Sequence, residues 1–373
     1  MNDQTKRTWA EVSLSAIEHN YRVMRACLPE GCKFLGVVKA DSYGHGAIPV
    51  SKRLEAIGCD YLAVACLDEA RTLRAAGVGL PILILGYTPA EYAPELAELR
   101  ITQAVGSLDY AAALSEALQG TGKTLTVHLK LETGMGRTGF RVFGDWKALP
   151  AATAVRLPGL YAEGVFTHFC VSDADVGVRD FTLEQLSRFR RAVEAIETRS
   201  GHTFAIKHCT NSGAMASFPE AYMDMVRPGV SLYGMYPGPD RERFELIPAM
   251  TLKTRVAYIE RHEPGDTISY GRTFTVERPS ELAVLPIGYA DGLHRTLSNK
   301  LRVLVNGHVA PQVGRICMDM CMADVTGLGV KPGDEVEIFG RNMPIDDVAD
   351  WAGTIHYELT CAVSPRVPRV YVD

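Results

Sequence analysis

The sequence predicts an α/β protein in which an N-terminal (β/α)8 TIM barrel is followed by a mostly antiparallel C-terminal β domain. Three observations carry this prediction. Short apolar runs alternate with amphipathic stretches from about residue 33 to residue 230, the number of such runs is eight, and the pattern changes after about residue 240. Strands that alternate with helices favour a parallel sheet, whereas short strands separated by turns favour antiparallel pairing.

Eight apolar runs, most of them rich in valine, isoleucine and leucine, are the candidate barrel strands. They span residues 33–40, 61–65, 81–86, 102–105, 124–132, 159–168, 204–209 and 224–229. The clearest helix between them is 180–201, which ends at Gly201, a residue type common at helix C-termini. The count of eight favours a closed barrel. An open doubly wound sheet is the alternative.

The second half of the chain contains short runs separated by Pro-Gly and Asn-Gly pairs. The candidate strands are 252–260, 267–274, 281–289, 301–309, 322–326 and 334–340. Asn306-Gly307 lies between two apolar runs, which is a strong hairpin signal. We therefore predict a barrel at residues 10–240 and a β domain at 241–373, with a linker at 237–249 and with residues 1–9 packed on the β domain.

Composition and charge exclude several classes of protein. A net charge of -5 over 373 residues gives no basic surface of the kind that binds nucleic acid. No apolar run is long enough to span a bilayer, and the first twelve residues lack the apolar core of a secretory signal. The nine cysteines are scattered and form no CxxC pair, which indicates reduced thiols in a cytoplasmic protein without a metal site.

Lys39 directly follows the first apolar run, within GVVKADSYGHG. At the end of a barrel strand it lies where such barrels keep their active sites. A lysine there needs an ion pair, a lowered pKa or covalent use as a Schiff base. Taken alone, Lys39 fits an ion pair with Asp41 equally well. Tyr43, Gly44 and Gly46 favour a ligand site, because they form a polar loop that allows close approach.

Four more strand ends carry polar groups. In chain order they are Lys130 and Arg137; His168; His208, Asn211 and Ser212; and Arg227, Gly229 and Val230. An Asn-Ser pair at a helix start is first an N-cap and second a phosphate site, and consecutive backbone amides can also cradle phosphate. The convergence of these groups would be costly without a polar ligand among them.

Three glycines, Gly134, Gly136 and Gly139, match the G-x-G-x-x-G pattern of dinucleotide-binding loops. The match follows the fifth run rather than the first, and no clear βαβ unit ending in an acidic residue follows it. We interpret the glycines as a tight loop that presents Arg137. A dehydrogenase is the weaker alternative.

With these residues in place, the chain resembles the alanine racemases, which are pyridoxal-phosphate (PLP) enzymes, over essentially its whole length. The motifs that carry the resemblance are VVKADSYGHGA, KLETGMGRTGF, HCTNS, SYGRTF, IGYADG, VGRICMDM and RVPR, in this order. The resemblance implies racemisation of an amino-acid substrate, alanine, in a head-to-tail homodimer with composite active sites.

The resemblance also implies residue roles. Lys39 would hold PLP as a Schiff base and act as one base, and Tyr270 of the other subunit would act as the second. The cofactor contacts would be Tyr43, Arg137, His168, Asn211, Ser212, Arg227, Gly229 and Val230. The substrate contacts would be Arg137, Tyr289, Met318 and Asp319. Supporting roles would fall to Lys130, which is carbamylated in many members, to His208, which orients Arg227, and to Arg295 in the entry channel.

Two bases on opposite faces of the substrate meet the chemical need of racemisation, because one base would have to move between the faces. Arg227 opposite the pyridine nitrogen would stay protonated, which weakens the electron sink and limits side reactions.

One departure from the family pattern concerns substrate scope. Pro365 stands where alanine racemases usually carry a tyrosine that touches the phosphate. Loss of that contact costs on the order of 1 kcal/mol, and the pocket wall changes shape. A serine or broad-spectrum small amino-acid racemase is therefore an alternative. A PLP-binding barrel without turnover is a further one, against which the SYGRTF and CMDM motifs of the β domain argue.

Overall fold

The computed structural model describes residues 5–143, 150–173, 179–238 and 243–373. The chain forms two compact units. The barrel unit consists of Glu18–Ser42 and Ala47–Leu246, and the β unit consists of Met1–Ile17, Tyr43–Gly46 and Ile247–Asp373. Residues 239–242 of the predicted linker and residues 1–4 of the predicted N-terminal segment lie outside the described residues.

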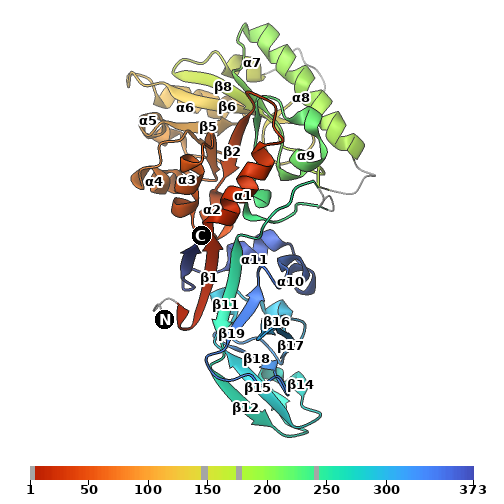
Figure 1. Cartoon of the computed structure of the whole chain (residues 1–373). Coiled ribbons are helices and arrows are strands. Elements are labelled where there is room, and N and C mark those ends of the chain that lie inside the picture. The colour runs from red at the N-terminus through yellow and green to blue at the C-terminus, as the bar shows by residue number, and fades with distance from the viewer. Residues whose placement is uncertain (1–4, 144–149, 174–178, 239–242) are drawn as a thin grey trace. The chain divides into compact units, whose positions relative to one another are not determined.

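Parallel strands build the barrel unit (Figure 1). In spatial order they are β10 (Met225–Val226), β2 (Lys33–Val37), β3 (Tyr61–Val64), β4 (Ile82–Ile84), β5 (Ile101–Val105), β6 (Leu125–Glu132), β8 (Leu160–Phe166) and β9 (Ile206–His208). A short strand, β7 (Phe140–Arg141), pairs with β6 off this path. Amide hydrogen bonds from Asp224 to Lys207 (3.1 Å) and from Arg227 to Thr210 (3.0 Å) join the two ends of the order. The predicted eight-stranded parallel barrel is confirmed.

The helices of this unit lie outside its strands (Figure 1). They are α3 (Ala47–Ala56), α4 (Leu67–Ala75), α5 (Ala93–Glu98), α6 (Leu108–Ala117), α7 (Pro150–Ala154), α8 (Arg179–Ser200) and α9 (Ser212–Ser217), while α1 (Leu14–Arg25) leads into the unit. Strands β3, β4 and β5 are buried at every position, as expected when both faces of a parallel sheet are covered. Helix α8 ends at Ser200, and the predicted C-cap residue Gly201 follows it with a φ of 69°.

A second sheet forms the β unit. Its strands, in spatial order, are β12 (Tyr258–His262), β15 (Ser280–Leu285), β18 (Cys321–Asp324), β17 (His308–Val313), β16 (Arg302–Val305), β19 (Glu335–Phe339), β11 (Met250–Arg255), β1 (Thr8–Ser13) and β20 (Arg369–Val372). All neighbours are antiparallel except β1 and β20. The predicted mostly antiparallel domain is confirmed, and it also contains α10 (Ile345–Ala352) and α11 (His356–Ala362).

The hairpin predicted at Asn306-Gly307 is present. Val305 pairs with His308, and the two residues between them have φ angles of 49° and 78°. Positive φ at both central positions is the conformation that favours Asn-Gly in tight hairpins.

The run 267–274, predicted as one strand, is divided in two. β13 (Thr267–Ile268) and β14 (Phe274–Thr275) pair with each other, and a tight turn carrying Tyr270 connects them. Ser269, at the start of this turn, has a φ of 64°. A positive φ cannot continue a strand, so the chain turns sharply and exposes Tyr270.

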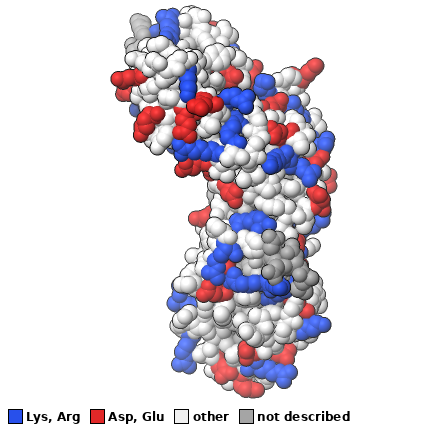
Figure 2. Space-filling view, turned by 90° about the vertical axis from the view of Figure 1, so that its left-hand side faces the viewer, with Lys and Arg blue, Asp and Glu red and all other residues white. Residues whose placement is uncertain are grey.

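Within the part of the chain that the structure describes, no helix combines the length and apolarity needed to cross a membrane. Figure 2 shows acidic and basic side chains interspersed over the face that it presents. None of the nine cysteines, all of which are described, forms a disulfide.

Candidate functional site

The turn after β2 has an unusual backbone. The short element α2 (Lys39–Tyr43) contains left-handed residues from Ala40 to Tyr43, with φ between 52° and 56°. A left-handed residue with a side chain costs roughly 1–2 kcal/mol, and such strain gathers at functional sites. The carboxylate of Glu69 accepts the amides of Ala40 (2.6 Å) and Ala65 (2.7 Å) and so pins the turn. The direction in which Lys39 leaves β2 is therefore fixed by its neighbours.

The glycines after this turn serve packing within the protein. A Cβ on Gly44 would lie 2.1 Å from the carbonyl oxygen of Thr360, and one on Gly46 would lie 1.9 Å from the hydroxyl of Tyr371. The interpretation that these glycines admit a ligand is therefore replaced by close packing inside the β unit. The ring of Tyr43, in the same segment, lies 6.1 Å from that of Tyr357.

His168, just after β8, lies within a cluster of positive charges. Burial and the neighbouring charges of Arg227, Arg137, Lys130 and Lys39 hold the pKa of His168 well below its ordinary value. The structure thus brings together the polar residues of four predicted strand ends. Such an excess of positive charge favours an anionic ligand.

Arg227, at the end of β10, is almost completely buried, with 4% of its surface exposed. Its guanidinium donates to the carbonyls of Thr167 (2.9 Å) and Cys209 (3.3 Å), and to Nδ1 of His208 (3.0 Å). Nδ1 of His168 lies 3.5 Å away. Burial lowers the pKa of Arg227 to about 10, so the side chain stays charged at neutral pH.

Lys130, on β6, is buried next to this arginine. Its Nζ donates to the carbonyl of Leu131 (2.9 Å) and lies 5.5 Å from the centre of the Phe166 ring. Burial, and then the charge of Arg227, lower the pKa of Lys130 to about 7. A large fraction of the amine is therefore neutral, and nucleophilic, at neutral pH.

The glycine loop after β6 is built around Glu132. The carboxylate of Glu132 accepts the amides of Gly134 (2.5 Å) and Arg137 (3.1 Å). Burial alone would raise the pKa of Glu132, but hydrogen bonds from the loop amides outweigh it and hold the pKa below the usual value. A dinucleotide-binding loop directs its amides to phosphates, whereas these point at the protein's own carboxylate. The geometry therefore argues against the dinucleotide alternative.

Two hollows adjoin the loop. One is lined by Arg137 and its neighbours from Glu132 to Phe143. The other, of about 340 Å³, is lined by Lys130, by residues that follow β4 and β5, among them Tyr87, and by Tyr110 of α6. Each hollow thus has a predicted site residue on its wall, Arg137 in one and Lys130 in the other.

The start of α9 and the end of β10 form a small cradle of hydrogen-bonding groups. Asn211 caps α9, its Oδ1 accepting the amide of Ala214 (2.9 Å), as predicted. The hydroxyl of Ser212 lies 2.9 Å from the amide of Gly229, and a 3-10 turn begins at Val230. Hydroxyl and amide donors placed together in this way suit a phosphate group.

Tyr289 and Met318 lie on adjoining loops of the β unit, whereas Tyr270 and Arg295 lie on two other turns. Tyr289 donates its amide to the carbonyl of Cys317 (3.1 Å). A Cβ on Gly288 would lie 2.4 Å from the carbonyls of Cys317 and Met318, so only glycine allows this approach. Tyr270, Tyr289 and Met318 are 69%, 43% and 53% exposed. Large apolar groups exposed together often mark an interaction surface.

An ion network not expected from the sequence supports these loops. Asp291 is fully buried and accepts two hydrogen bonds of 2.9 Å from Arg7 and an ion pair of 3.0 Å from Arg366. Arg366 also donates to Asp319 (2.9 Å). The network ties a predicted substrate residue to its scaffold. The neighbouring Pro365 is exposed, as is Arg295.

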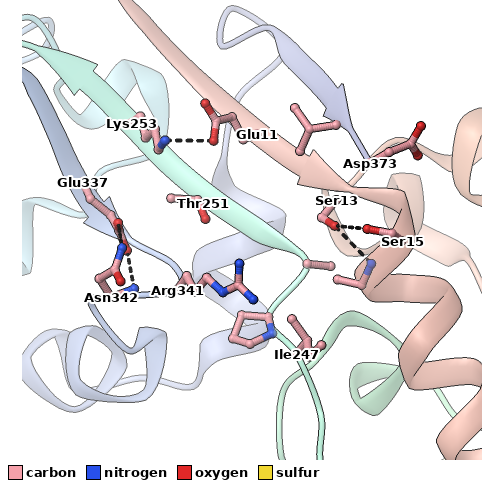
Figure 3. Close-up of a pocket in the computed structure, with 14 residues that line it drawn as sticks. Glu11, Ser13, Ser15, Ile247, Thr251, Lys253, Glu337, Arg341, Asn342 and Asp373 are labelled. Carbon is pink, nitrogen blue, oxygen red and sulfur yellow. Dashed lines mark hydrogen bonds and ion pairs between the residues drawn. The ribbon is translucent and has the colours of Figure 1, made fainter.

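A separate hollow in the β unit contains none of the predicted residues among its lining (Figure 3). Lys253 pairs there with Glu11 at 2.8 Å, and Glu337 accepts the amide of Asn342 at 2.8 Å. Figure 3 shows Arg341 directed towards the centre of this hollow. Elsewhere too, the described residues contain no group of three or more His, Cys, Asp or Glu side chains suited to a metal ion.

His128 was missed by the sequence analysis. It hydrogen-bonds to His208 at 2.9 Å and is completely buried. A signal was available, because His128 and Lys130 are two residues apart on one strand and therefore share a face.

Comparison with known proteins identifies relatives over the whole chain. The family model described as "Alanine racemase, N-terminal domain" matches residues 12–237, and "Alanine racemase, C-terminal domain" matches residues 249–371. The chain is 45% identical to the alanine racemase of Desulforamulus reducens and 46% identical to that of Desulfovibrio desulfuricans, over 98% of both chains in each case.

Solved structures give the same result. The alanine racemase of Clostridium difficile 630 has a TM-score of 0.92 and 40% identity, over 99% of this chain and 96% of that one. The alanine racemase of Bacillus anthracis with bound L-Ala-P has a TM-score of 0.92 and 34% identity, over 99% and 95% of the two chains.

Proposed function

The chain belongs to the alanine racemase family, and from this premise we propose that it interconverts L-alanine and D-alanine with bound PLP, using Lys39 and Tyr270 as its two bases. The observation that carries the proposal is the match of both family domains over nearly the full length. A structural observation, the cationic cluster around His168, also supports the proposal.

The residues of the barrel unit fit PLP. Its phosphate and phenolate are anionic, and the cluster around His168 has an excess of positive charge. Lys39 would hold the cofactor covalently, and Arg227 would face its ring nitrogen. Ser212, Gly229 and Val230 would hold its phosphate, because their hydroxyl and amide groups lie together. The family motifs alone assign Tyr43 to the same phosphate and Asn211 to the cofactor.

PLP supplies an electron sink that makes the substrate Cα–H acidic. The task of the chain is then to move one proton on each face. Lys39 takes or returns it on one face, and Tyr270 does so on the other. Arg137, exposed at the loop tip, binds the substrate carboxylate. Met318, Asp319 and Tyr289 line the substrate side, and Arg295 lies along its entry.

We further propose a head-to-tail homodimer in which Tyr270 of one chain completes the site around Lys39 of the other. The exposure of Tyr270, Tyr289 and Met318 supports this, since a surface of such residues is well suited to be covered by a partner. We assign the protein to the cytoplasm on the chemistry of its nine cysteines, which remain thiols.

The proposed function is tested by racemase activity against a panel of L-amino acids with added PLP. Alanine should be the preferred substrate, and borohydride should trap the cofactor on the peptide that contains Lys39. The variant Lys123→Ala, on the surface beside Glu98, serves as the control. A colourless PLP-treated protein, or one that leaves alanine unchanged, would contradict the proposal.

Pro365 favours a second candidate, a racemase that also accepts serine. A tyrosine at this position would restore the narrower wall of the family pattern. Pro365→Tyr should therefore lower serine turnover relative to alanine turnover. An unchanged ratio would show that Pro365 does not determine specificity.

A further inference from the structure

A continuous chain of hydrogen bonds runs through the inside of the barrel. It leads from Nη1 of Arg227 to Nδ1 of His208 (3.0 Å), and from Nε2 of His208 to Nδ1 of His128 (2.9 Å). Nε2 of His128 then lies 3.1 Å from Oε2 of Glu163, which also accepts the hydroxyl of Tyr61 (3.1 Å). Barrel interiors are usually filled by branched apolar side chains, so a polar chain of this length calls for an explanation.

The two histidines in this row of hydrogen bonds, His208 and His128, are neutral. Each is completely buried, and burial is the main cause that lowers the pKa of His128 and of His208. A neutral imidazole has one donor and one acceptor nitrogen. Its hydrogen bonds therefore depend on which nitrogen carries the proton.

The groups at the two ends of the hydrogen-bond network, Arg227 and Glu163, determine which nitrogens carry the protons. Arg227 can only donate, so Nδ1 of His208 must accept and Nε2 must donate. His128 then accepts at Nδ1 and donates from Nε2 to Glu163. All N–H bonds point from Arg227 towards Glu163. A carboxylate is the terminal group that fits this direction, because it only accepts.

Glu163 also balances charge. The hydrogen bond from His128 is the main cause that holds the pKa of Glu163 below its usual value, so this side chain is ionised. Arg227 carries the opposite charge at the other end of the hydrogen-bond network. A buried charge is costly unless it is compensated, and two polarised imidazoles connect this one to a carboxylate.

The barrel is shaped to hold these rings. Phe166 stacks on His208, with ring centres 4.9 Å apart and an interplanar angle of 12°. A Cβ at Gly164 would lie 2.7 Å from Cε1 and Nε2 of His128. The absence of a side chain at this position gives the His128 ring its space.

We propose that His128 and Glu163 are positioning residues of the site: they fix the tautomer of His208 and thereby the direction of the Arg227 guanidinium. The last link rests on the proposed function, in which Arg227 faces the ring nitrogen of PLP. The tautomers themselves do not rest on it.

The first test is nitrogen-15 NMR of the PLP-loaded protein with labelled histidines at pH 7. His128 and His208, assigned with the variants His128→Gln and His208→Gln, should both be neutral with the proton on Nε2. A proton on Nδ1 of either ring, or a charged ring, would overturn the proposed direction. A protein without racemase activity would contradict the proposed function but leave this result readable.

The second test is Glu163→Gln, which keeps the shape and removes the charge. The His128 signals should change to a mixture of tautomers. We expect kcat to fall roughly ten- to a hundredfold, as when an outer partner of a metal-binding histidine is lost, with KM within about twofold. Glu163→Asp, which keeps the charge, should recover the original tautomers.

The matched control is Glu95→Gln, because Glu95 is a surface carboxylate paired with Arg71 at 2.7 Å in the same unit. It should leave the tautomers and kcat unchanged. If Glu163→Gln gives the same result as this control, Glu163 has no positioning role and the proposal is wrong.

Discussion

At the scale of single residues, both proposed bases are held by backbone that side-chain-bearing residues seldom adopt. Lys39 precedes a left-handed turn that continues to Tyr43. Tyr270 follows Ser269, whose φ is 64°, and precedes two more residues of positive φ. Each left-handed residue with a side chain raises the conformational free energy of the folded state. These residues lie next to the two side chains whose direction matters for the reaction. The chemical group of each base is thus determined by the residue itself, and the direction of its side chain by the left-handed residues beside it.

The first prediction concerns Tyr270. Tyr270→Phe removes the phenol that would act on one face of the substrate and leaves Lys39 on the other. Removal of the Cα proton of L-alanine should therefore slow much more than that of D-alanine, measured by deuterium exchange. Tyr258→Phe, which changes another exposed tyrosine of the β unit, is the control. Equal losses with both enantiomers would count against the two-base assignment.

The second prediction concerns Lys130. Carbamylation requires the neutral amine, and the pKa of Lys130 is lowered to about 7 by burial. Protein treated with carbon-13 bicarbonate should show a carbamate carbon by NMR that is strong at pH 8 and weaker at pH 6. Lys130→Ala should lack it, whereas Lys123→Ala should keep it. Absence of the resonance from the unchanged protein at pH 8 would show that Lys130 stays a free amine.

At the scale of elements, the loop after β6 owes its shape to one carboxylate. Glu132 accepts the loop amides, and its pKa is held below the usual value. The unfolded chain therefore takes up this proton first as the pH falls. The stabilisation by Glu132 is complete above about pH 4.5 and is lost as the pH falls through the folded-state value.

Glu132→Gln should remove that contribution. The free energy of unfolding should fall by about 2 kcal/mol at pH 7, and by less at pH 3, because the unfolded chain has then taken up this proton and part of the stabilisation is already lost. Urea unfolding followed by circular dichroism at the two pH values measures this. Glu98→Gln, an exposed carboxylate of the barrel unit, is the comparison. A loss that is the same at both pH values would mean that the charge of Glu132 does not hold the loop.

The same elements show what the sequence can predict. The eight barrel strands are recognisable because each is a short run of apolar residues closed by polar or turn residues, and the signal is local. Strand β1 (Thr8–Ser13) was missed as a strand, because its sequence TWAEVS contains no apolar run, and its partners β11 and β20 lie more than two hundred residues away. No local pattern reports such a pairing.

The site divides in the same way. Lys39, Lys130, His168 and Arg227 could be found because polar groups at strand ends stand out against apolar runs. Glu163 could not, because its role depends on a hydrogen bond to a histidine on another strand. The sequence reports the kind of residue at a strand end, but a chain of contacts through the interior needs the coordinates of each strand.

At the scale of the whole molecule, the proposed composite site makes a prediction about mixtures. Lys39→Ala and Tyr270→Phe dimers should each be nearly inactive. After unfolding and refolding together, mixed dimers would have one site with both residues intact and one with neither.

Random pairing should then restore about a quarter of the activity of the protein without substitutions. Racemase assays of the refolded mixture, with each variant refolded alone as the control, measure the recovery. If the mixture gains nothing, Lys39 and Tyr270 act within the same chain.

The place of β1 has a consequence for how the protein is made. Translated early, β1 finds its sheet partners only when β11 (Met250–Arg255) and β20 (Arg369–Val372) have left the ribosome. At the usual rate of synthesis, the first of them follows after roughly ten to fifty seconds. For that interval the strand has both edges unpaired, while the segments of the barrel are being completed behind it. An unpaired strand edge is a site of aggregation, so β1 exposes the nascent chain to aggregation until its partner strands are synthesised.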